Sequence, residues 1–275
     1  MNSLLPKIVG AILNSIGIFN SKLASRIALK IFSKPRKGKL TTNANSFLDT
    51  ANKSTLYYTE FNIQIYHWKG PKETILLAHG WESNSSRWRN KIEKLQKEGY
   101  DIIALDAPAH GGSGSDTFNA ILYSEFINVV SQKFKPTIFL GHSVGAMAII
   151  FFLHKQIYRD ANKIVLLGSP STFTGIMKRY KKMMGYSKII DNGIDRHIEL
   201  TFGHPPRYYS TANLIKNINS NGLIFHDKRD PIIPYKDALE IDLQFKNATL
   251  ISTKGLGHSL KGNYVSDEII KFLRH

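Results

Sequence analysis

The residue of this sequence whose surroundings most clearly indicate covalent chemistry is a serine between two glycines. Ser143 is the centre of the segment GHSVG, which directly follows an apolar stretch at 137–140 and directly precedes another apolar segment. Glycine on both sides allows a sharp turn that exposes the serine hydroxyl at the start of a helix. Because a serine hydroxyl is a weak nucleophile at neutral pH, it requires a general base and a group that orients the base.

Candidates for both groups follow in the chain, in the order serine, acid, histidine. Asp230 comes after the apolar stretch 222–225, and the prolines of the segment Asp-Pro-Ile-Ile-Pro fix the loop just after its carboxylate. Asp227 lies in the same loop and is the alternative acid. His258 lies in the glycine-flanked loop GLGHS, ahead of the last amphipathic segment. We therefore expect Ser143 as nucleophile, His258 as general base and Asp230 as the residue that orients the histidine.

Acyl transfer also requires hydrogen-bond donors for the oxyanion that develops at the attacked carbonyl group. The segment His79-Gly80-Trp81 follows an apolar strand pattern and releases a loop at the same predicted edge of the sheet. We expect the backbone N–H groups of Trp81 and Val144 to be the two donors, and we assign His79 no chemical role. The chain has no cysteine, so thiolate metal sites and a cysteine nucleophile are excluded. We expect neither a cofactor nor a metal.

The elements that must position these residues follow an alternating pattern. Short apolar runs predict buried strands, and longer amphipathic segments between them predict helices, which together indicate an α/β fold with a mostly parallel sheet. An antiparallel hairpin at 55–60 and 63–68, turning at Phe61-Asn62, is predicted at the sheet edge. The predicted strands lie at 74–78, 102–105, 137–140, 163–167, 222–225 and 248–251, and the helices at 87–97, 119–134, 146–155, 235–244 and 266–273.

One connection is too long for a simple crossover. About fifty residues separate the strand ending near Leu167 from the next strand, and residues 171–210 are predicted to form a small, mostly helical cap over the sheet. The polar segment 40–53 is predicted as a linker or surface loop. The predicted organisation is therefore an N-terminal extension at 1–40, an α/β core at 54–170 and 211–275, and the cap insertion at 171–210.

The N-terminal extension carries half of the excess positive charge. Residues 1–40 contain eight basic residues and no acidic one, against a net charge of +16 for the whole chain. Apolar side chains at near-helical spacing predict an amphipathic helix over residues 4–32, interrupted near Gly17. The segment has neither a signal-peptide pattern nor an apolar run long enough to span a membrane. We expect a cytoplasmic protein whose extension either docks on the body of the protein or makes peripheral membrane contact; nucleic-acid binding is not expected.

These motifs resemble those of the α/β-hydrolase superfamily, in its esterase- and lipase-like branch with a helical cap. The resemblance extends from Thr55 to the C-terminus and also includes the segment Asp-Ala-Pro-Ala-His-Gly-Gly-Ser that begins at Asp106. It implies an intact catalytic triad, and it implies that Asp106 and His110 shape the site and do not react. The basic N-terminal helix and Asp227, where relatives often have glycine, depart from the family pattern.

The resulting hypothesis is a serine hydrolase that cleaves a small-molecule carboxylic ester through an acyl-enzyme on Ser143. Two alternatives stay open: a lipid esterase or thioesterase that works at a membrane surface, and a non-catalytic scaffold with the same fold. The fold alone does not identify a substrate, because unrelated reactions share it.

Overall fold

The computed structural model describes residues 4 to 274, and these residues form two compact units. One unit, named here the helical unit, comprises Met1–Lys34 and Thr172–Ser210. The other, the sheet unit, comprises Pro35–Ser171 and Thr211–His275. Most of the segment predicted as an N-terminal extension and the segment predicted as a cap therefore belong to the same unit.

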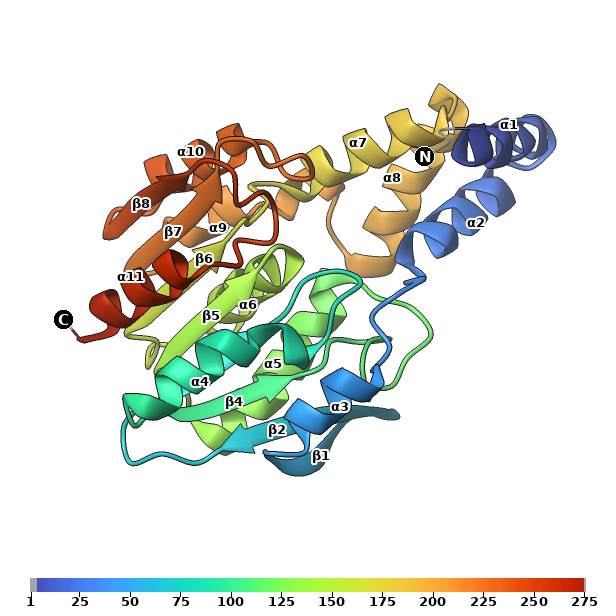
Figure 1. The fold of residues 1–275 in the computed structure, drawn as a ribbon. Coiled ribbons are helices and arrows are strands. Elements are labelled where there is room, and N and C mark those ends of the chain that lie inside the picture. The colour runs from blue at the N-terminus through green and yellow to red at the C-terminus, as the bar shows by residue number, and fades with distance from the viewer. Residues whose placement is uncertain (1–3, 275) are drawn as a thin grey trace. The chain divides into compact units, whose positions relative to one another are not determined.

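An eight-stranded sheet forms the centre of the sheet unit (Figure 1). Its strand order is β1-β2-β4-β3-β5-β6-β7-β8, in which β2 runs antiparallel to β1 and β4 and all other neighbours are parallel. The inner parallel strands are apolar and buried at nearly every position, as expected for a sheet with helices on both faces. The strands are β1 Asn52–Tyr58, β2 Phe61–Trp68, β3 Thr74–Ala78, β4 Asp101–Leu105, β5 Ile138–His142, β6 Lys163–Leu167, β7 Asn221–Asp227 and β8 Ala248–Thr253.

Helices cover both faces of this sheet. On one face, α3 Thr42–Leu48, α4 Arg89–Lys97 and α11 Asn263–Arg274 bury apolar side chains in a common core with the strands. On the other face, α5 Ala120–Phe134 packs against α6 Val144–Gln156, which is followed by α9 Thr211–Ile215 and α10 Tyr235–Gln244 (Figure 1). This alternation of strand and helix places the carboxyl ends of the parallel strands, and the loops that follow them, at one edge of the sheet.

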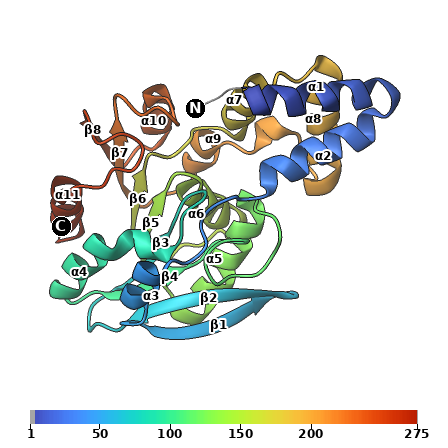
Figure 2. The ribbon, with the colours of Figure 1, turned by 45° about the vertical axis from the view of Figure 1, so that its right-hand side comes forward.

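The helical unit is built from α1 Leu4–Phe19, α2 Ser21–Ser33, α7 Phe173–Met184 and α8 Lys188–Phe202. Figure 2 shows α1 and α2 as an antiparallel pair with α7 and α8 beside it. Short 3₁₀ turns occur at Pro206–Tyr208 in this unit and at Ser85–Trp88 in the sheet unit. Among the described residues, no helix combines the length and the apolar character that crossing a membrane requires.

Three local predictions differ from the structure. The break in the N-terminal helix lies at Asn20, whose side chain accepts a hydrogen bond from the N–H of Leu23, and Gly17 lies inside α1. The hairpin turns at 59–60, so that Phe61 is the first residue of β2 and pairs with Tyr58. The segment predicted as a loop at 40–53 contains α3, which the tertiary contact between Phe47 and the ring of a strand tryptophan stabilises.

Candidate active site

Ser143 occupies a strained turn between β5 and α6. Its backbone has φ 54° and ψ −127°, a combination that is sparsely populated for residues with a side chain. Its N–H donates to the carbonyl of Leu167 at 2.8 Å, which holds the turn against the neighbouring strand. A Cβ atom at Gly145 would lie 2.4 Å from the carbonyl oxygens of both Ala78 and His79. The glycine therefore permits the close packing of α6 against the end of β3.

Three side chains distant in the sequence meet beside this turn. His258 Nε2 lies 3.0 Å from Ser143 Oγ, and His258 Nδ1 lies 2.7 Å from Asp230 Oδ2. Because the carboxylate can only accept, Nδ1 carries the proton and Nε2 is the free acceptor that faces the serine hydroxyl. The structure thus brings together the three residues that the sequence singled out, in an arrangement that can transfer a proton from the hydroxyl to the imidazole.

The Asp230 carboxylate is buried and fully hydrogen-bonded. Its Oδ1 accepts from the backbone N–H groups of Ile232 and Ile233 at 2.8 and 2.9 Å. Its Oδ2 accepts from His258, and His226 Nε2 lies 3.4 Å away. Burial by itself raises the pKa of Asp230, but the hydrogen bonds from the two histidines and from the two backbone groups outweigh it and hold the pKa well below its ordinary value. The Asp230 carboxylate is therefore negatively charged when His258 takes up a proton and needs a counter-charge.

Asp227, the alternative acid, has different partners. Its Oδ1 accepts from the N–H of Arg229, and its Oδ2 accepts from Thr253 Oγ1 and from the N–H of Leu256, each at 2.8 Å. Burial raises the pKa of Asp227, and these bonds, with one from the N–H of Gly255, lower it to about 2. The Asp227 carboxylate thus connects the end of β7 to β8 and to the loop that leads to His258, and its hydrogen-bond partners do not include the imidazole.

Two buried histidines support this arrangement, and the sequence reasoning assigned them no part in it. His226 Nε2 lies 2.9 Å from the carbonyl oxygen of Ile233, so this nitrogen carries a proton that also faces Asp230. His142 Nε2 lies 2.8 Å from the carbonyl oxygen of His258 and so connects the histidine loop to β5. A histidine four residues before a candidate acid at the end of a strand is the sequence signal that would have identified His226.

Two backbone N–H groups lie at the ends of β3 and β5. Gly80, directly before Trp81, abuts the nucleophile turn: a Cβ atom on it would lie 2.9 Å from the Cβ of Ser143. Val144 is the first residue of α6, where N–H groups have no partner within the helix. In the part of the chain that the structure describes, neither Trp81 nor Val144 donates its N–H to an acceptor. Both N–H groups therefore remain free to donate a hydrogen bond to a bound ligand.

The loops around these donors are held by a buried polar network. The His79 ring connects two loops. Its Nδ1 lies 2.8 Å from the carbonyl oxygen of Gly80, and its Nε2 accepts from the N–H of Ala107 at 2.9 Å. Burial lowers the pKa of His79, so the ring is neutral. His110 binds the same loops in the same way, because its Nε2 accepts from the N–H of Glu82. Both rings position backbone and leave the chemistry to other groups.

Asp106 lies at the centre of that network. Its Oδ1 accepts from the N–H and the hydroxyl of Ser85, and its Oδ2 accepts from the hydroxyl of Tyr66 and the N–H of Gly112. Burial raises the pKa of Asp106, and these four donors oppose that effect. The Asp106 side chain is fully buried, and both of its oxygens accept hydrogen bonds. It therefore positions the segments that carry these donors.

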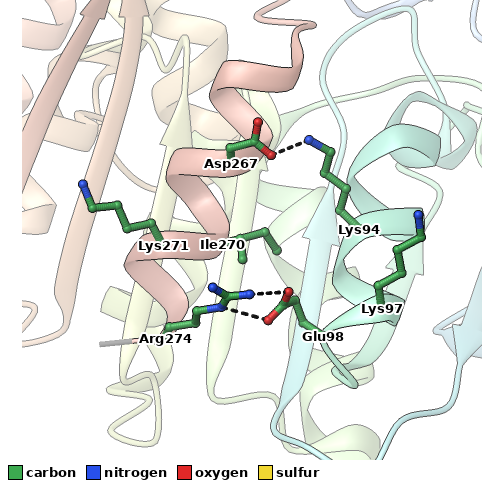
Figure 3. A pocket seen from close by; sticks show the side chains of 7 residues that line it. All are labelled: Lys94, Lys97, Glu98, Asp267, Ile270, Lys271 and Arg274. Atoms are coloured by element: carbon green, nitrogen blue, oxygen red, sulfur yellow. Dashed lines mark hydrogen bonds and ion pairs between the residues drawn. The ribbon is translucent and has the colours of Figure 1, made fainter.

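A separate surface hollow of about 340 Å³ lies between α4 and α11 (Figure 3). Glu98 and Arg274 close one end with two hydrogen bonds of 2.9 and 2.7 Å, and Lys94 pairs with Asp267 at the other. Because Glu98 shortly precedes β4, the hollow lies near the amino ends of the parallel strands. Ser143 lies at the opposite, carboxyl ends of these strands. Its lining residues are Lys94, Lys97, Glu98, Asp267, Ile270, Lys271 and Arg274. The residues described contain no cluster of three or more side chains suited to a metal ion.

Comparisons with known proteins agree with this architecture. Residues 75–210 match the model of the alpha/beta hydrolase family. The chain is 20% identical over 259 residues to the uncharacterized hydrolase YugF of Bacillus subtilis, covering 78% of this chain and 94% of that protein. Among solved structures, Est1E from Butyrivibrio proteoclasticus, with ferulic acid bound, superposes with a TM-score of 0.67 at 15% identity over 80% of this chain and 98% of that one.

An esterase from Exiguobacterium antarcticum superposes with a TM-score of 0.60 at 16% identity, over 78% of this chain and 96% of that one. At these identities a structural likeness establishes the fold, and the family match over 75–210 adds the turn that carries Ser143. The resemblance to the α/β-hydrolase superfamily that the sequence motifs indicated is thereby confirmed. The chain belongs to the α/β-hydrolase superfamily.

Proposed function

We propose that this hydrolase cleaves carboxylic esters through an acyl-enzyme on Ser143. The observation that carries the proposal is the continuous set of hydrogen-bond contacts from Ser143 Oγ through the His258 ring to the Asp230 carboxylate, at 3.0 and 2.7 Å. An ester is the proposed bond because an esterase is among the similar structures and another holds a carboxylic acid, ferulic acid.

In the first half of the reaction, His258 Nε2 removes the hydroxyl proton as Ser143 Oγ attacks the ester carbonyl carbon. The resulting oxyanion accepts hydrogen bonds from the backbone N–H groups of Trp81 and Val144. Collapse of the intermediate breaks the bond to the alcohol oxygen, which leaves with the proton from His258. Asp230 stabilises the imidazolium that exists between the two proton transfers.

In the second half, a water molecule gives its proton to His258 and attacks the acyl carbon. The bond to Ser143 Oγ then breaks, the oxygen regains its proton, and the carboxylic acid leaves. The complete cycle converts one ester and one water molecule into one carboxylic acid and one alcohol, without an added cofactor. The strained turn at Ser143 and the buried Asp230 keep the reacting groups in place throughout the cycle.

The test compares the wild type with Ser143→Ala on p-nitrophenyl esters of increasing acyl length, with an acyl thioester series as comparison. Ser169→Ala is the matched control, because Ser169 is also buried and follows the neighbouring strand β6. We expect Ser143→Ala to lower kcat by at least about 10³-fold and to abolish labelling by a fluorophosphonate, and we expect the control to stay within threefold. Labelling that persists in Ser143→Ala, or no labelling of the wild type, would contradict the proposal; the second outcome would favour a non-catalytic scaffold.

A further inference from the structure

The helix α1 exposes its large apolar side chains. Phe19 is 91% exposed and Leu4 is 64% exposed, and four further large apolar residues of the same helix face solvent. At 100° per residue five of these six, all but Ile18, fall within about one third of the helix circumference. We name this set the apolar face of α1: Leu4, Leu5, Ile8, Ile12 and Phe19.

The opposite side of α1 buries Gly10, Leu13 and Gly17, and one asparagine beside them makes hydrogen bonds. A Cβ atom at Gly10 would lie 1.7 Å from the carbonyl oxygen of Met184, so the helix approaches the end of α7 backbone to backbone. The Asn14 side chain donates to the carbonyl of Gly185 at 2.9 Å and accepts from the N–H of Ser187 at 2.8 Å. These contacts fix the rotation of α1 about its axis. The apolar face is therefore held outward by the packing within the helical unit.

The neighbouring helix α2 adds a line of positive charge. Lys22, Arg26 and Lys30 are spaced at i, i+4 and i+8, and all three are exposed. The other side of α2 is buried, and Ser25 Oγ there donates to the carbonyl of Ile190 in α8. The two helices pack against each other and contain no acidic residue. We name these three residues the basic stripe of α2.

We propose that the apolar face of α1 and the basic stripe of α2 bind the surface of a membrane that contains anionic lipid. An amphipathic helix with basic residues beside its apolar side lies in the plane of the interface, with apolar side chains among the acyl chains and cations at the phosphates. A fixed, outward apolar face is costly in water, and the lipid interface offsets that cost. This surface is independent of the ester hydrolysis proposed above.

A second copy of the chain is a weaker occupant of the same surface. In a symmetric dimer the same patch meets itself, so the basic stripe of one copy would approach that of the other without an acidic residue of either helix between them. Anionic lipid headgroups instead supply the opposite charge. The charge pattern thus favours the membrane, and the dimer becomes an outcome that the experiment must be able to detect.

The test uses the full chain with Ser143→Ala, so that no lipid is hydrolysed during binding. Cosedimentation is measured with vesicles of phosphatidylcholine and phosphatidylglycerol at 3:1, and with vesicles of phosphatidylcholine alone. We expect binding to the anionic vesicles to be at least tenfold stronger and to weaken as salt is raised.

Two pairs of variants separate the two parts of the surface. For the apolar face, Ile8→Glu/Ile12→Glu should weaken binding more than tenfold. Its control, Leu239→Glu/Leu243→Glu, changes two exposed residues at the same spacing on α10 of the sheet unit and should stay within threefold. Circular dichroism should show unchanged helix content in both, because all four side chains are exposed.

For the basic stripe, Lys22→Gln/Arg26→Gln/Lys30→Gln should weaken binding about 100-fold, since each basic residue near an anionic surface contributes roughly a factor of five. The control neutralises three exposed lysines of the sheet unit and removes the same total charge: Lys216→Gln, Lys246→Gln and Lys254→Gln.

Equal binding by the variants and their controls would overturn the proposal, as would binding that does not depend on anionic lipid. Light scattering during size exclusion, at the concentrations of the binding assay, tests the dimer. A dimer that Ile8→Glu/Ile12→Glu converts to monomer, together with no vesicle binding by the wild type, would assign the surface to a second copy.

Discussion

Asparagine substitutions at Asp227, the last residue of β7, and at Asp230, in the loop before α10, distinguish the acid of the proposed triad from a purely structural carboxylate. Asp230 and Asp227 lie three residues apart, and both side chains are buried and multiply hydrogen-bonded. Asp230→Asn and Asp227→Asn each replace one carboxylate oxygen with an amide group of nearly the same size. The two variants therefore differ mainly in which neighbours lose an acceptor.

In Asp230→Asn, the backbone N–H groups of Ile232 and Ile233 retain the amide oxygen, so the amide NH₂ must face His258. The imidazole can accept that hydrogen bond only in the tautomer with its proton on Nε2, where it cannot take the proton from Ser143. We expect kcat to fall by about 10³- to 10⁴-fold, which is a barrier increase of roughly 4–5.5 kcal/mol. KM should change little, because no substrate contact is lost.

In Asp227→Asn, the amide NH₂ would face the N–H of Leu256, which is a contact between two donors. One lost hydrogen bond to a charged acceptor costs about 1.5–3 kcal/mol of the free energy of unfolding. We expect a lower thermal midpoint and a kcat within tenfold of the wild type, because the bond from His258 to Asp230 persists. Loosening of the 255–256 loop accounts for the remaining change in kcat.

The assay is steady-state hydrolysis of a short p-nitrophenyl ester, with thermal unfolding followed by circular dichroism on the same samples. A 10³-fold loss of kcat in Asp227→Asn, with Asp230→Asn within tenfold of the wild type, would refute the assignment and make Asp227 the acid. Comparable large losses in both variants, with native stability, would show that the two carboxylates act as one unit.

Three further outcomes follow from other contacts. Gly145→Ala should lower the thermal midpoint and the activity, because its Cβ would lie 2.4 Å from the carbonyl oxygens of Ala78 and His79; an unchanged midpoint would contradict the packing argument. Asp106→Asn should lower the free energy of unfolding by about 2–4 kcal/mol in a urea titration, because four donors surround the carboxylate; a change below 0.5 kcal/mol would contradict this. The pKa of Asp227 is lowered to about 2, so its contribution to stability is complete above its unfolded value near 3.8 and is lost as pH falls through 2. Asp227→Asn should therefore show a smaller loss of stability between pH 4 and pH 2 than the wild type in acid titrations.

The regular elements of the sheet unit could be predicted because their signals are local. The strands β3 and β6 match the predicted ranges, and α10 does as well, since an apolar run or a helical period is present in the residues themselves. The helix α3 could not be predicted in this way, because its seven residues are polar at most positions. Its Phe47 ring stacks on Trp68 at 5.5 Å, a contact that exists only after the sheet has formed.

The orientation of the N-terminal helices was also beyond local pattern. Their apolar periodicity predicted an amphipathic segment and left open whether it docks on the protein or on a membrane. The structure shows that α1 contacts the end of α7 through Gly10 and Asn14, while Ile8 and Ile12 stay exposed. Which side of a helix turns inward depends on the partner surface, and here the smallest side chains permit the closest approach.

By itself the sequence determined the fold class, the turn that carries Ser143 and the chain order of the candidate acid and base, because strand-turn-helix patterns and glycine positions act over a few residues. The tertiary structure decided which of two neighbouring aspartates reaches His258, and it revealed the support from His226 and His142. Those outcomes depend on distances between loops that are separated by up to 116 residues in the chain. Only the pairing of the parallel strands within one sheet, which brings their carboxyl ends together on the same side, sets those distances.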